Sequence, residues 1–302
     1  MPFTLPPPLQ RWIEATAAAL LHPPGAAPFD FATPPGEEAL VPPSSLAWRV
    51  FKNPVVLFTG GVAAVILELG EPRVRTGVWE HSSFRTDPLG RLQRTGLAAM
   101  VTVYGPRRAA ERMIAGVVRA HGAVAGRTPA GEPYRANDPA LLDWVQATAA
   151  FGFATAYHRY VRPLDGEEMD RLLAEGRPAA RLYGALGAPE SRAGMEALFA
   201  AVRPRMEPSP ILAEFLGLMR ATPILPRPLR PLQRLLVRAA VDLVPAEDRR
   251  RLGIPAREAL RPWERPLLRA LGALADRLVL ASGPAARSCR RLGLPADFLY
   301  RG

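Results

Sequence analysis

Two basic side chains and a hydroxyl occur at helical spacing in the middle of the chain. Arg91, Arg94 and Thr95 are three and four residues apart, so they lie on one face of a helix. A second apolar helix ends at His121. Two cations, a hydroxyl and an imidazole on neighbouring helices have the chemistry to hold an anionic cofactor that handles oxygen. The same four residues can instead have unrelated structural roles, and both interpretations stay open at this point.

His121 is the residue with the most specific chemistry. One neutral imidazole does not hold a bare metal ion, but it can be the axial ligand of a haem, whose porphyrin supplies four further ligands. His121 follows Val117 and Val118, and it precedes Gly122 and Ala123, which leave room for a flat ring. A lone histidine in an apolar helix is more often a hydrogen-bonded core residue, and this remains the alternative.

Structural roles also explain the polar residues around Arg91. Asp87 precedes Arg91 by four residues, a spacing that suits an ion pair of about 0.2–0.5 kcal/mol. The hydroxyl of Thr95 can donate to the backbone carbonyl of Arg91, and Arg94 can extend into solvent. The spacing alone therefore does not separate a cofactor site from an ordinary helix surface.

A carboxylate and an imidazole are adjacent at Glu80 and His81. They form an acid–base pair if either faces a cavity, whereas capping of the neighbouring helix is the favoured alternative. Trp144 and Phe151 are seven residues apart on one helical segment, which indicates core or cavity lining. His158 is interpreted as a surface or helix-packing residue.

The common motifs of metal, nucleotide and hydrolase sites are absent from the sequence. None of the four histidines occurs in His-x-His, His-Glu-x-x-His or Glu-x-x-His spacing. The sequence also lacks Gly-x-Gly-x-x-Gly, Gly-x-x-x-x-Gly-Lys-[Ser/Thr] and Gly-x-Ser-x-Gly. Cys289 is the only cysteine, which excludes a disulfide framework and a thiolate metal cluster.

The positive charge of the chain is concentrated near its C-terminus. The formal net charge is +11, and from Arg227 onward 16 Arg oppose 7 Asp and Glu, an excess of +9. In residues 229–243, Arg230, Arg234 and Arg238 recur every four residues opposite an apolar side. This pattern is typical of an interfacial membrane helix, or of the solvated side of a packed helix. Without interleaved aromatic residues or a zinc-finger spacing, nucleic-acid binding is not expected.

Hydrophobic periodicity predicts an all-α protein. The chain has 302 residues, 48% of them hydrophobic, and period-2 strands are scarce. We predict a Pro-rich N-terminal arm over 1–45, with a short helix over 9–21, and a single helical domain of about ten to twelve helices over 46–302. The longest apolar stretch, 55–69, is shorter than the roughly 20 residues of a membrane span, and no signal-peptide pattern is evident. We therefore expect a cytoplasmic protein, at most peripheral to a membrane.

Capping residues followed by proline mark the starts of the central helices. Asp87-Pro88 and Asp138-Pro139 predict helices that end near Tyr104 and Val161, with a further helix from Pro106 to about Val124 between them. Other helices are predicted over 53–69, 73–82, 165–175, 191–202, 211–219, 229–243, 256–280 and 284–292.

Seven short motifs in a fixed order resemble a known family. They are W-E-H-S-S-F at 79–84, D-P at 87–88, R-x-x-R-T at 91–95, Y-G at 104–105, V-x-x-H-x-x-V-x-G at 118–126, Y-x-A-N-D-P at 134–139 and W-V at 144–145. Together they resemble the MpaB-type oxygenases, a family that includes the bacterial rubber oxygenases called latex clearing proteins. The match is dense over 53–187 and weaker towards the C-terminus.

The resemblance implies an all-α, globin-like fold with one haem b and dioxygen as co-substrate. It implies that His121 binds the haem iron and that Arg91, Arg94 and Thr95 are catalytic and cofactor-binding residues on the distal side. The substrate it implies is a hydrophobic small molecule or lipid, such as an isoprenoid chain cleaved at a carbon–carbon double bond. Rubber oxygenases have lysine at the position of Arg94, and arginine, which stays charged, does not ligate iron. Their acidic base has no clear counterpart, and Glu80 is the nearest candidate.

Three functions follow from these considerations. The first is a haem-dependent oxygenase. The second is a non-catalytic haem- or lipid-binding protein on the same scaffold, which the departure at Arg94 and the missing base motivate. The third is a family member that has lost haem and keeps a helical pocket for another ligand.

Overall fold

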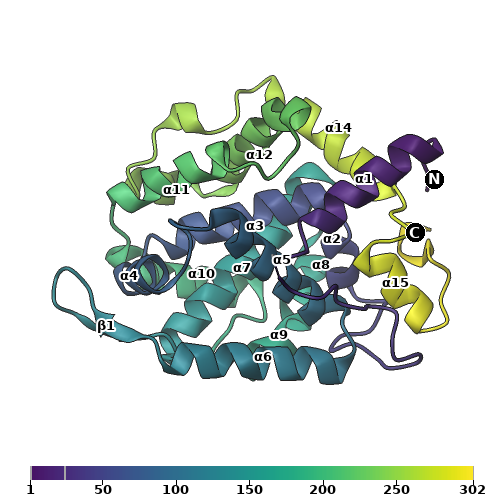
Figure 1. Cartoon of the computed structure of the whole chain (residues 1–302). Coiled ribbons are helices and arrows are strands. Elements are labelled where there is room, and N and C mark those ends of the chain that lie inside the picture. The colour runs from purple at the N-terminus through teal and green to yellow at the C-terminus, as the bar shows by residue number, and fades with distance from the viewer. Residues whose placement is uncertain (1, 24, 302) are drawn as a thin grey trace.

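Two helices, α3 (Pro54–Glu68) and α7 (Pro139–Tyr160), run side by side through the centre of the molecule (Figure 1). Asn53 starts α3, because its side chain accepts hydrogen bonds from the backbone N–H groups of the first turn and Pro54 has the required φ. Gly60 and Gly152 lie at the crossing. A Cβ atom at Gly152 would be 2.3 Å from the carbonyl oxygen of Gly60, so the two backbones touch and only glycine fits.

The computed structural model describes residues 2–23 and 25–301, and helices surround the central pair on all sides (Figure 1). Their bounds are α1 (Pro7–Ala19), α2 (Leu46–Phe51), α4 (Pro72–His81), α5 (Pro88–Tyr104), α6 (Arg107–Gly122), α8 (Gly166–Glu175), α9 (Arg177–Tyr183), α10 (Arg192–Val202), α11 (Pro210–Ala221), α12 (Arg230–Leu243), α13 (Ala246–Arg251), α14 (Glu264–Arg277) and α15 (Pro284–Arg291). The prediction of an all-α fold is confirmed.

One antiparallel hairpin interrupts the helical architecture. Strands β1 (Ala125–Arg127) and β2 (Pro133–Arg135) pair with Gly126 opposite Tyr134, and their loop projects from the molecule (Figure 1). The hairpin was not predicted, because two three-residue strands carry no measurable alternation.

Most predicted helices are confirmed to within two or three residues, but α14 is shorter than predicted. The prediction covered 256–280, whereas the helix runs from Glu264 to Arg277. A short 3-10 turn at Ala256–Glu258 and a bend before Pro262 replace its expected beginning. Proline at 262 disfavours helical backbone in the residue before it, and this explains the late start.

The hydrophobic core has two parts. The larger part lies between α3, α7, α10, α11 and α12, and the smaller part joins α2, α5, α6 and α15. In the smaller part, the hydroxyl of Tyr104 donates to the carbonyl of Trp48 at 2.6 Å, and Cys289 is fully buried. Phe31 and Leu40 of the Pro-rich N-terminal segment are buried there too, so this segment contributes to the core.

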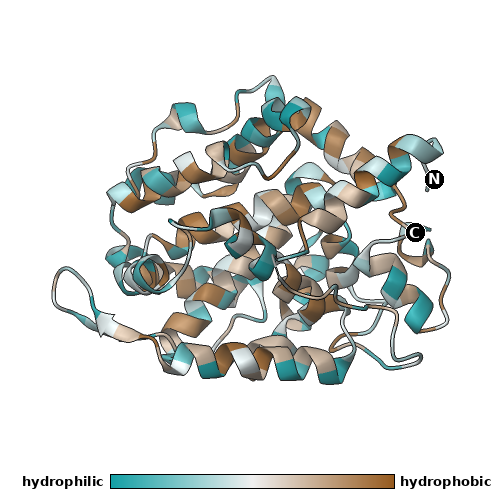
Figure 2. Ribbon diagram, viewed as in Figure 1, coloured by the Kyte–Doolittle hydropathy of each residue, from teal (hydrophilic) through white to brown (hydrophobic). Residues whose placement is uncertain are grey.

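Helix α12 places its apolar side inside the molecule. Leu236, Val237 and Leu243 are buried, and the helix packs against α3. Hydropathy colouring shows brown, hydrophobic turns along the central helix α3, against which α12 packs (Figure 2). Of the arginines predicted on the polar side, Arg238 pairs with Glu264 at 3.0 Å. The apolar side of residues 229–243 thus lies in the core, as the packed-helix alternative predicts.

Within the described ranges, no single helix has the length and hydropathy needed to cross a membrane. The segments Pro54–Glu68 and Pro72–His81 satisfy those criteria only as a pair, and they are bent by 113° relative to each other.

Candidate functional site

A polar cluster lies where the end of α3, the start of α5, the end of α6 and the middle of α7 come together. It consists of Glu68 at the end of α3, Arg91 in the first turn of α5, His121 in the last turn of α6 and Thr148 in α7. We call these four residues the Arg91 cluster, because the charge of Arg91 acts on both Glu68 and His121. The helix starts predicted at Pro88 and Pro139 are confirmed, and they set the positions of Arg91 and Thr148.

Arg91 is half-buried and incompletely hydrogen-bonded. Its Nη1 donates to Thr95 Oγ1 at 2.5 Å, and its guanidinium lies over the ring of Phe84, 5.3 Å from the centroid. Its Nε is buried and has no partner among the described residues. Burial lowers the pKa of Arg91, and the carboxylate of Glu68 opposes that shift. An arginine nevertheless stays charged, so a cation with one unused donor lies in the cluster.

The ring of His121 is half-buried beside that cation. Its Nδ1 is buried and, in the described part of the chain, has no hydrogen-bond partner. Burial lowers the pKa of His121, and the positive charge of Arg91 lowers it further. The imidazole is therefore neutral near pH 7 and keeps a lone pair, which is the form that binds metals.

Glu68 is the residue that the sequence analysis missed. Burial raises its pKa to about 7, although Arg91 and a hydrogen bond from Thr148 act in the opposite direction. That bond joins Thr148 Oγ1 to Glu68 Oε1 over 3.3 Å. The only available signal was a single carboxylate inside the apolar run 55–69. A carboxyl group that titrates near neutral pH can accept or release a proton under physiological conditions.

Arg94 and Thr95 are exposed on the outer side of α5. Arg94 pairs with Asp87 at 3.3 Å and donates to Ser83 Oγ at 2.5 Å. Thr95 donates to the carbonyl of Arg91 at 2.9 Å, which is the structural role anticipated for it. The ion pair anticipated between Asp87 and Arg91 is thus made by Arg94, while Asp87 also caps α5 through the N–H of Gly90.

Glu80 and His81 are grouped with the hairpin. His81 Nε2 is 3.1 Å from the hydroxyl of Tyr134 in β2, and burial together with Glu80 raises the pKa of that tyrosine. Both residues are exposed, and Glu80 lines an open hollow with Ser82, Arg85 and Glu214 among others. This hollow lies at the end of α4.

The other two residues proposed as pocket lining belong to the core. The rings of Trp144 and Phe151 pack against Phe199 of α10, with centroid distances of 4.9 and 5.1 Å. His158 has a packing role, because its Nδ1 accepts the backbone N–H of Leu164 at 3.0 Å.

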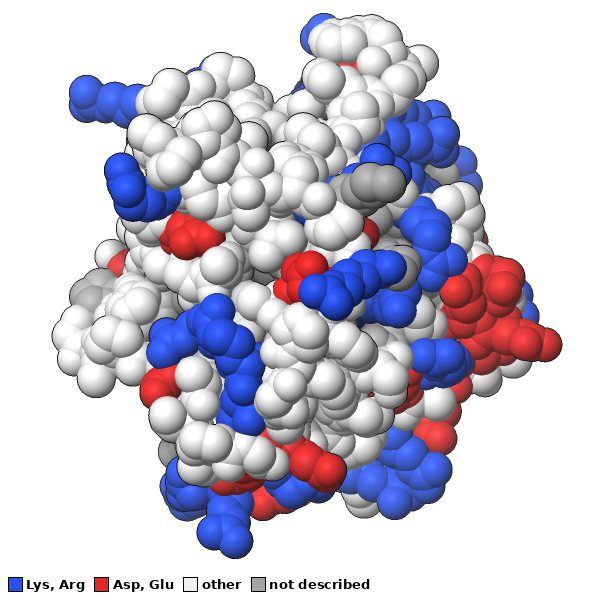
Figure 3. Space-filling view, turned by 90° about the vertical axis from the view of Figure 1, so that its right-hand side faces the viewer, with Lys and Arg blue, Asp and Glu red and all other residues white. Residues whose placement is uncertain are grey.

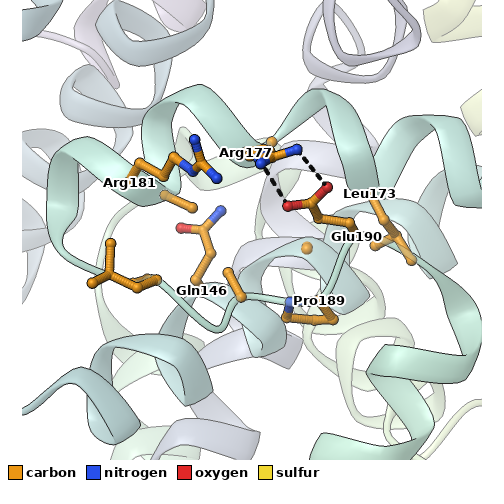
Figure 4. Close-up of a pocket in the computed structure, with 12 residues that line it drawn as sticks. Gln146, Leu173, Arg177, Arg181, Pro189 and Glu190 are labelled. Atoms are coloured by element: carbon orange, nitrogen blue, oxygen red, sulfur yellow. Dashed lines mark hydrogen bonds and ion pairs between the residues drawn. The ribbon is translucent and has the colours of Figure 1, made fainter.

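A separate small pocket lies between α7, α8 and α9. Figure 4 shows Arg177 bound to Glu190 on one side of it and Arg181 beside Gln146 on the other. The ion pair joins Arg177 Nε and Glu190 Oε1 at 3.0 Å. None of the residues predicted to form a site is among its lining residues.

Comparison with known proteins identifies the family. Residues 48–277 match the family model described as the catalytic domain of the ER-bound oxygenase mpaB/B′ and rubber oxygenase. No curated protein and no solved structure matches the chain. The matched range contains the whole Arg91 cluster and extends beyond the stretch 53–187 that carries the motifs. The chain therefore belongs to the mpaB and rubber oxygenase catalytic-domain family.

Proposed function

We propose that this protein is a haem b-dependent oxygenase that oxidises a hydrophobic substrate with dioxygen. Membership of an oxygenase family supports the reaction class. The observation that carries the proposal is the imidazole of His121, whose buried Nδ1 lacks a hydrogen-bond partner within the described residues.

The chemistry of the Arg91 cluster is compatible with haem. An axial ligand must be a neutral imidazole, and the low pKa of His121 satisfies that requirement. The propionate groups of haem are anionic, and Arg91 offers a permanent positive charge with an unused Nε donor. In this proposal His121 holds the iron, and Arg91 holds a propionate or polarises the distal side. Thr95 is proposed in a supporting role, because it contacts Arg91. Arg94 is proposed to add positive charge on the same helix, where it binds Asp87 and Ser83.

Bound haem would supply an iron centre that activates dioxygen. The chain itself contributes charge and proton transfer. Glu68 keeps a proton on its carboxyl group until about pH 7, and the nearby guanidinium of Arg91 makes its release easier. In this proposal Glu68, rather than the exposed Glu80, is the group that exchanges a proton with the reacting molecule.

The proposed substrate class is an isoprenoid hydrocarbon. The name of the family includes rubber oxygenases, and rubber is a polyisoprenoid. Such a substrate has no charged group to recognise, so binding must come from apolar side chains and specificity from the fit.

The test is a visible absorption spectrum of protein reconstituted with haem. We expect a Soret band from the wild type and its loss, or a shift to a weakly bound form, for His121→Ala. His22→Ala is the matched control, because His22 is exposed on the N-terminal segment and should leave the band unchanged. A His121→Ala protein with full haem content and an unaltered spectrum would overturn the ligand assignment.

Activity is measured separately as oxygen consumption with a dispersed polyisoprene oligomer, followed by detection of carbonyl products. Consumption that requires both haem and oligomer supports the oxygenase. Haem binding without oxygen consumption favours the non-catalytic haem-binding protein.

A further inference from the structure

The outer side of α14 carries an exposed apolar stripe. Trp263, at the N-cap of the helix, is followed by Leu267, Ala270 and Leu274 at spacings of four, three and four residues, so all four share one face. Trp263 is 63% exposed, Leu267 53% and Leu274 57%. We call these four residues the α14 ridge. Exposed large apolar side chains that are aligned rather than scattered indicate a contact surface.

The opposite side of α14 is firmly held by the core. Leu268 is fully buried, and a Cβ atom at Gly272 would lie 2.1 Å from the carbonyl oxygen of Tyr160, so the helix backbone touches the end of α7. Glu264 is buried and pairs with Arg238 of α12. The packing of the opposite side therefore fixes α14 with its ridge directed outwards. A small rotation of α14 about its axis would not bury the ridge.

Charges next to the ridge are segregated by sign. Arg257, Arg261, Arg269 and Arg277 are exposed, and across residues 2–23 and 25–301 none of their guanidinium groups forms an ion pair with a carboxylate within 4.0 Å. The acidic residues of α14 are turned inwards instead. Glu264 binds Arg238, and Asp276 binds Lys52 at 2.8 Å. The guanidinium groups exposed beside the ridge are thus basic without a paired carboxylate, while the acidic residues of α14 pair with other basic side chains.

The N-terminal helix extends this edge of the molecule. The backbone N–H of Phe3 donates to the carbonyl of Arg277 at 3.1 Å, which fixes the start of the chain beside the end of α14. Leu9 and Trp12 of α1 are exposed, at 45% and 42%. The face on the right-hand side of Figure 1 carries Lys and Arg side chains at many places, together with some Asp and Glu and with uncharged surface between them (Figure 3).

We propose that the α14 ridge binds the surface of a bilayer that contains anionic lipids. Tryptophan and leucine at the apolar–polar boundary, with guanidinium groups beside them, are the composition of an interfacial membrane helix. The unpaired arginines favour a lipid surface as the occupant, because a sheet of phosphate groups neutralises all of them at once. Helix α12 is also basic, but its apolar side lies in the core. Helix α14 combines an exposed apolar face with unpaired arginines beside it. This inference is independent of the proposed oxygenase reaction.

The test is co-sedimentation of the full chain with vesicles of phosphatidylcholine alone or mixed with phosphatidylglycerol. We expect binding to the mixed vesicles that weakens as salt is added. The triple variant Trp263→Ser, Leu267→Ser, Leu274→Ser should reduce the partition coefficient at least about tenfold. The matched control is Leu182→Ser with Leu186→Ser, which removes exposed leucines from the α9 region and should bind as the wild type does.

A second pair of variants isolates the charge. Arg257→Gln, Arg261→Gln and Arg277→Gln together should weaken binding to the anionic vesicles. Changing three exposed arginines of α6 to glutamine alters the net charge equally and should have a smaller effect; these are Arg108, Arg112 and Arg119.

Three results would overturn the proposal. The first is a wild type that ignores anionic vesicles, and the second is an equal loss in the ridge variants and their controls. The third is a wild-type dimer in light scattering that the triple serine variant converts to monomer, since a second copy would then cover the ridge. Circular dichroism of each variant checks that the protein is folded.

Discussion

Two effects shift the pKa of Glu68 in opposite directions, namely the burial of its carboxyl group and the positive charge of Arg91. Burial favours the neutral acid at Glu68, while the guanidinium of Arg91 favours the carboxylate, and burial prevails by raising the pKa to about 7. Carboxyl groups whose pKa is shifted in this way cluster at sites of proton transfer. The cluster therefore combines a neutral imidazole at His121 with a carboxylic acid that ionises near neutral pH.

This predicts a pH-dependent stability that Glu68→Gln removes. The pKa of Glu68 rises from 4.5 to about 7 on folding, so the folded state binds the proton more tightly. Stability contributed by the protonated form is complete below pH 4.5 and is lost as the pH rises through 7, up to about 3 kcal/mol. Thermal unfolding of haem-free protein between pH 5 and pH 8 measures this. Compared with the wild type, Glu68→Gln should lose less stability over the range, whereas the exposed Glu167→Gln should follow the wild type. Parallel pH profiles for Glu68→Gln and the wild type would contradict the assignment.

At the scale of elements, the contact of α3 with α7 determines the geometry of the cluster. Gly60 and Gly152 let the two backbones touch, and the same helices carry Glu68 and Thr148 about two turns and about one turn from that crossing. A shift of one helix along the other would separate the 3.3 Å pair between Thr148 and Glu68. The glycines therefore position the acid although neither touches it.

Gly152→Ala is expected to destabilise the fold by about 2–3 kcal/mol, because the new methyl group would overlap the carbonyl of Gly60. The matched control is Gly217→Ala in α11, where a Cβ atom meets nothing within 4 Å. That change should stabilise the protein by about 0.5–1 kcal/mol, since alanine loses less backbone entropy in a helix. Denaturant unfolding measures both, and equal effects of the two changes would refute the role of the crossing.

Local signals in the sequence were sufficient for most helices but not for the chemistry. A capping residue followed by proline determines the starts of α5 and α7, because both effects act within one turn. The cluster depends on contacts between distant segments. The residues next to Glu68 in the sequence do not predict that its carboxyl group is buried by the packing of other helices. In the same way, the sequence around Arg94 does not predict that its guanidinium binds Ser83 and Asp87.

At the scale of the whole molecule, Arg291 joins segments from both ends of the chain. This buried arginine donates to the carbonyls of Phe31 and Glu37, both at 2.7 Å, and to that of Tyr104 at 2.8 Å. The Pro-rich N-terminal segment, the end of α5 and α15 are thereby held at one point. The family match covers residues 48–277, so Arg291 and the N-terminal segment lie outside it and Tyr104 lies inside.

Arg291→Met should cost about 3 kcal/mol, because the carbonyls of Phe31 and Glu37 lose the guanidinium donor and that of Tyr104 keeps only the hydroxyl of Ser288. Limited proteolysis should then cut the N-terminal segment between residues 25 and 45 faster than in the wild type. Arg290→Met is the control, since Arg290 is the exposed neighbour on the same helix. Unchanged cleavage and stability in Arg291→Met would show that the apolar contacts of Phe31 and Leu40 alone hold this segment.

Helix α6 buries few of its side chains, and this affects which part of the Arg91 cluster can open most readily. Ala110 and Ile114 are its only buried residues, and it runs along the outer edge of the molecule (Figure 1). Glu68 and Thr148 belong to the two deeply packed central helices, whereas His121 belongs to a helix with few buried side chains. Because local opening is easiest where few apolar side chains are buried, we expect α6 to open more readily than α3 and α7. His121 would then leave and rejoin the cluster while Glu68 and Thr148 stay in place.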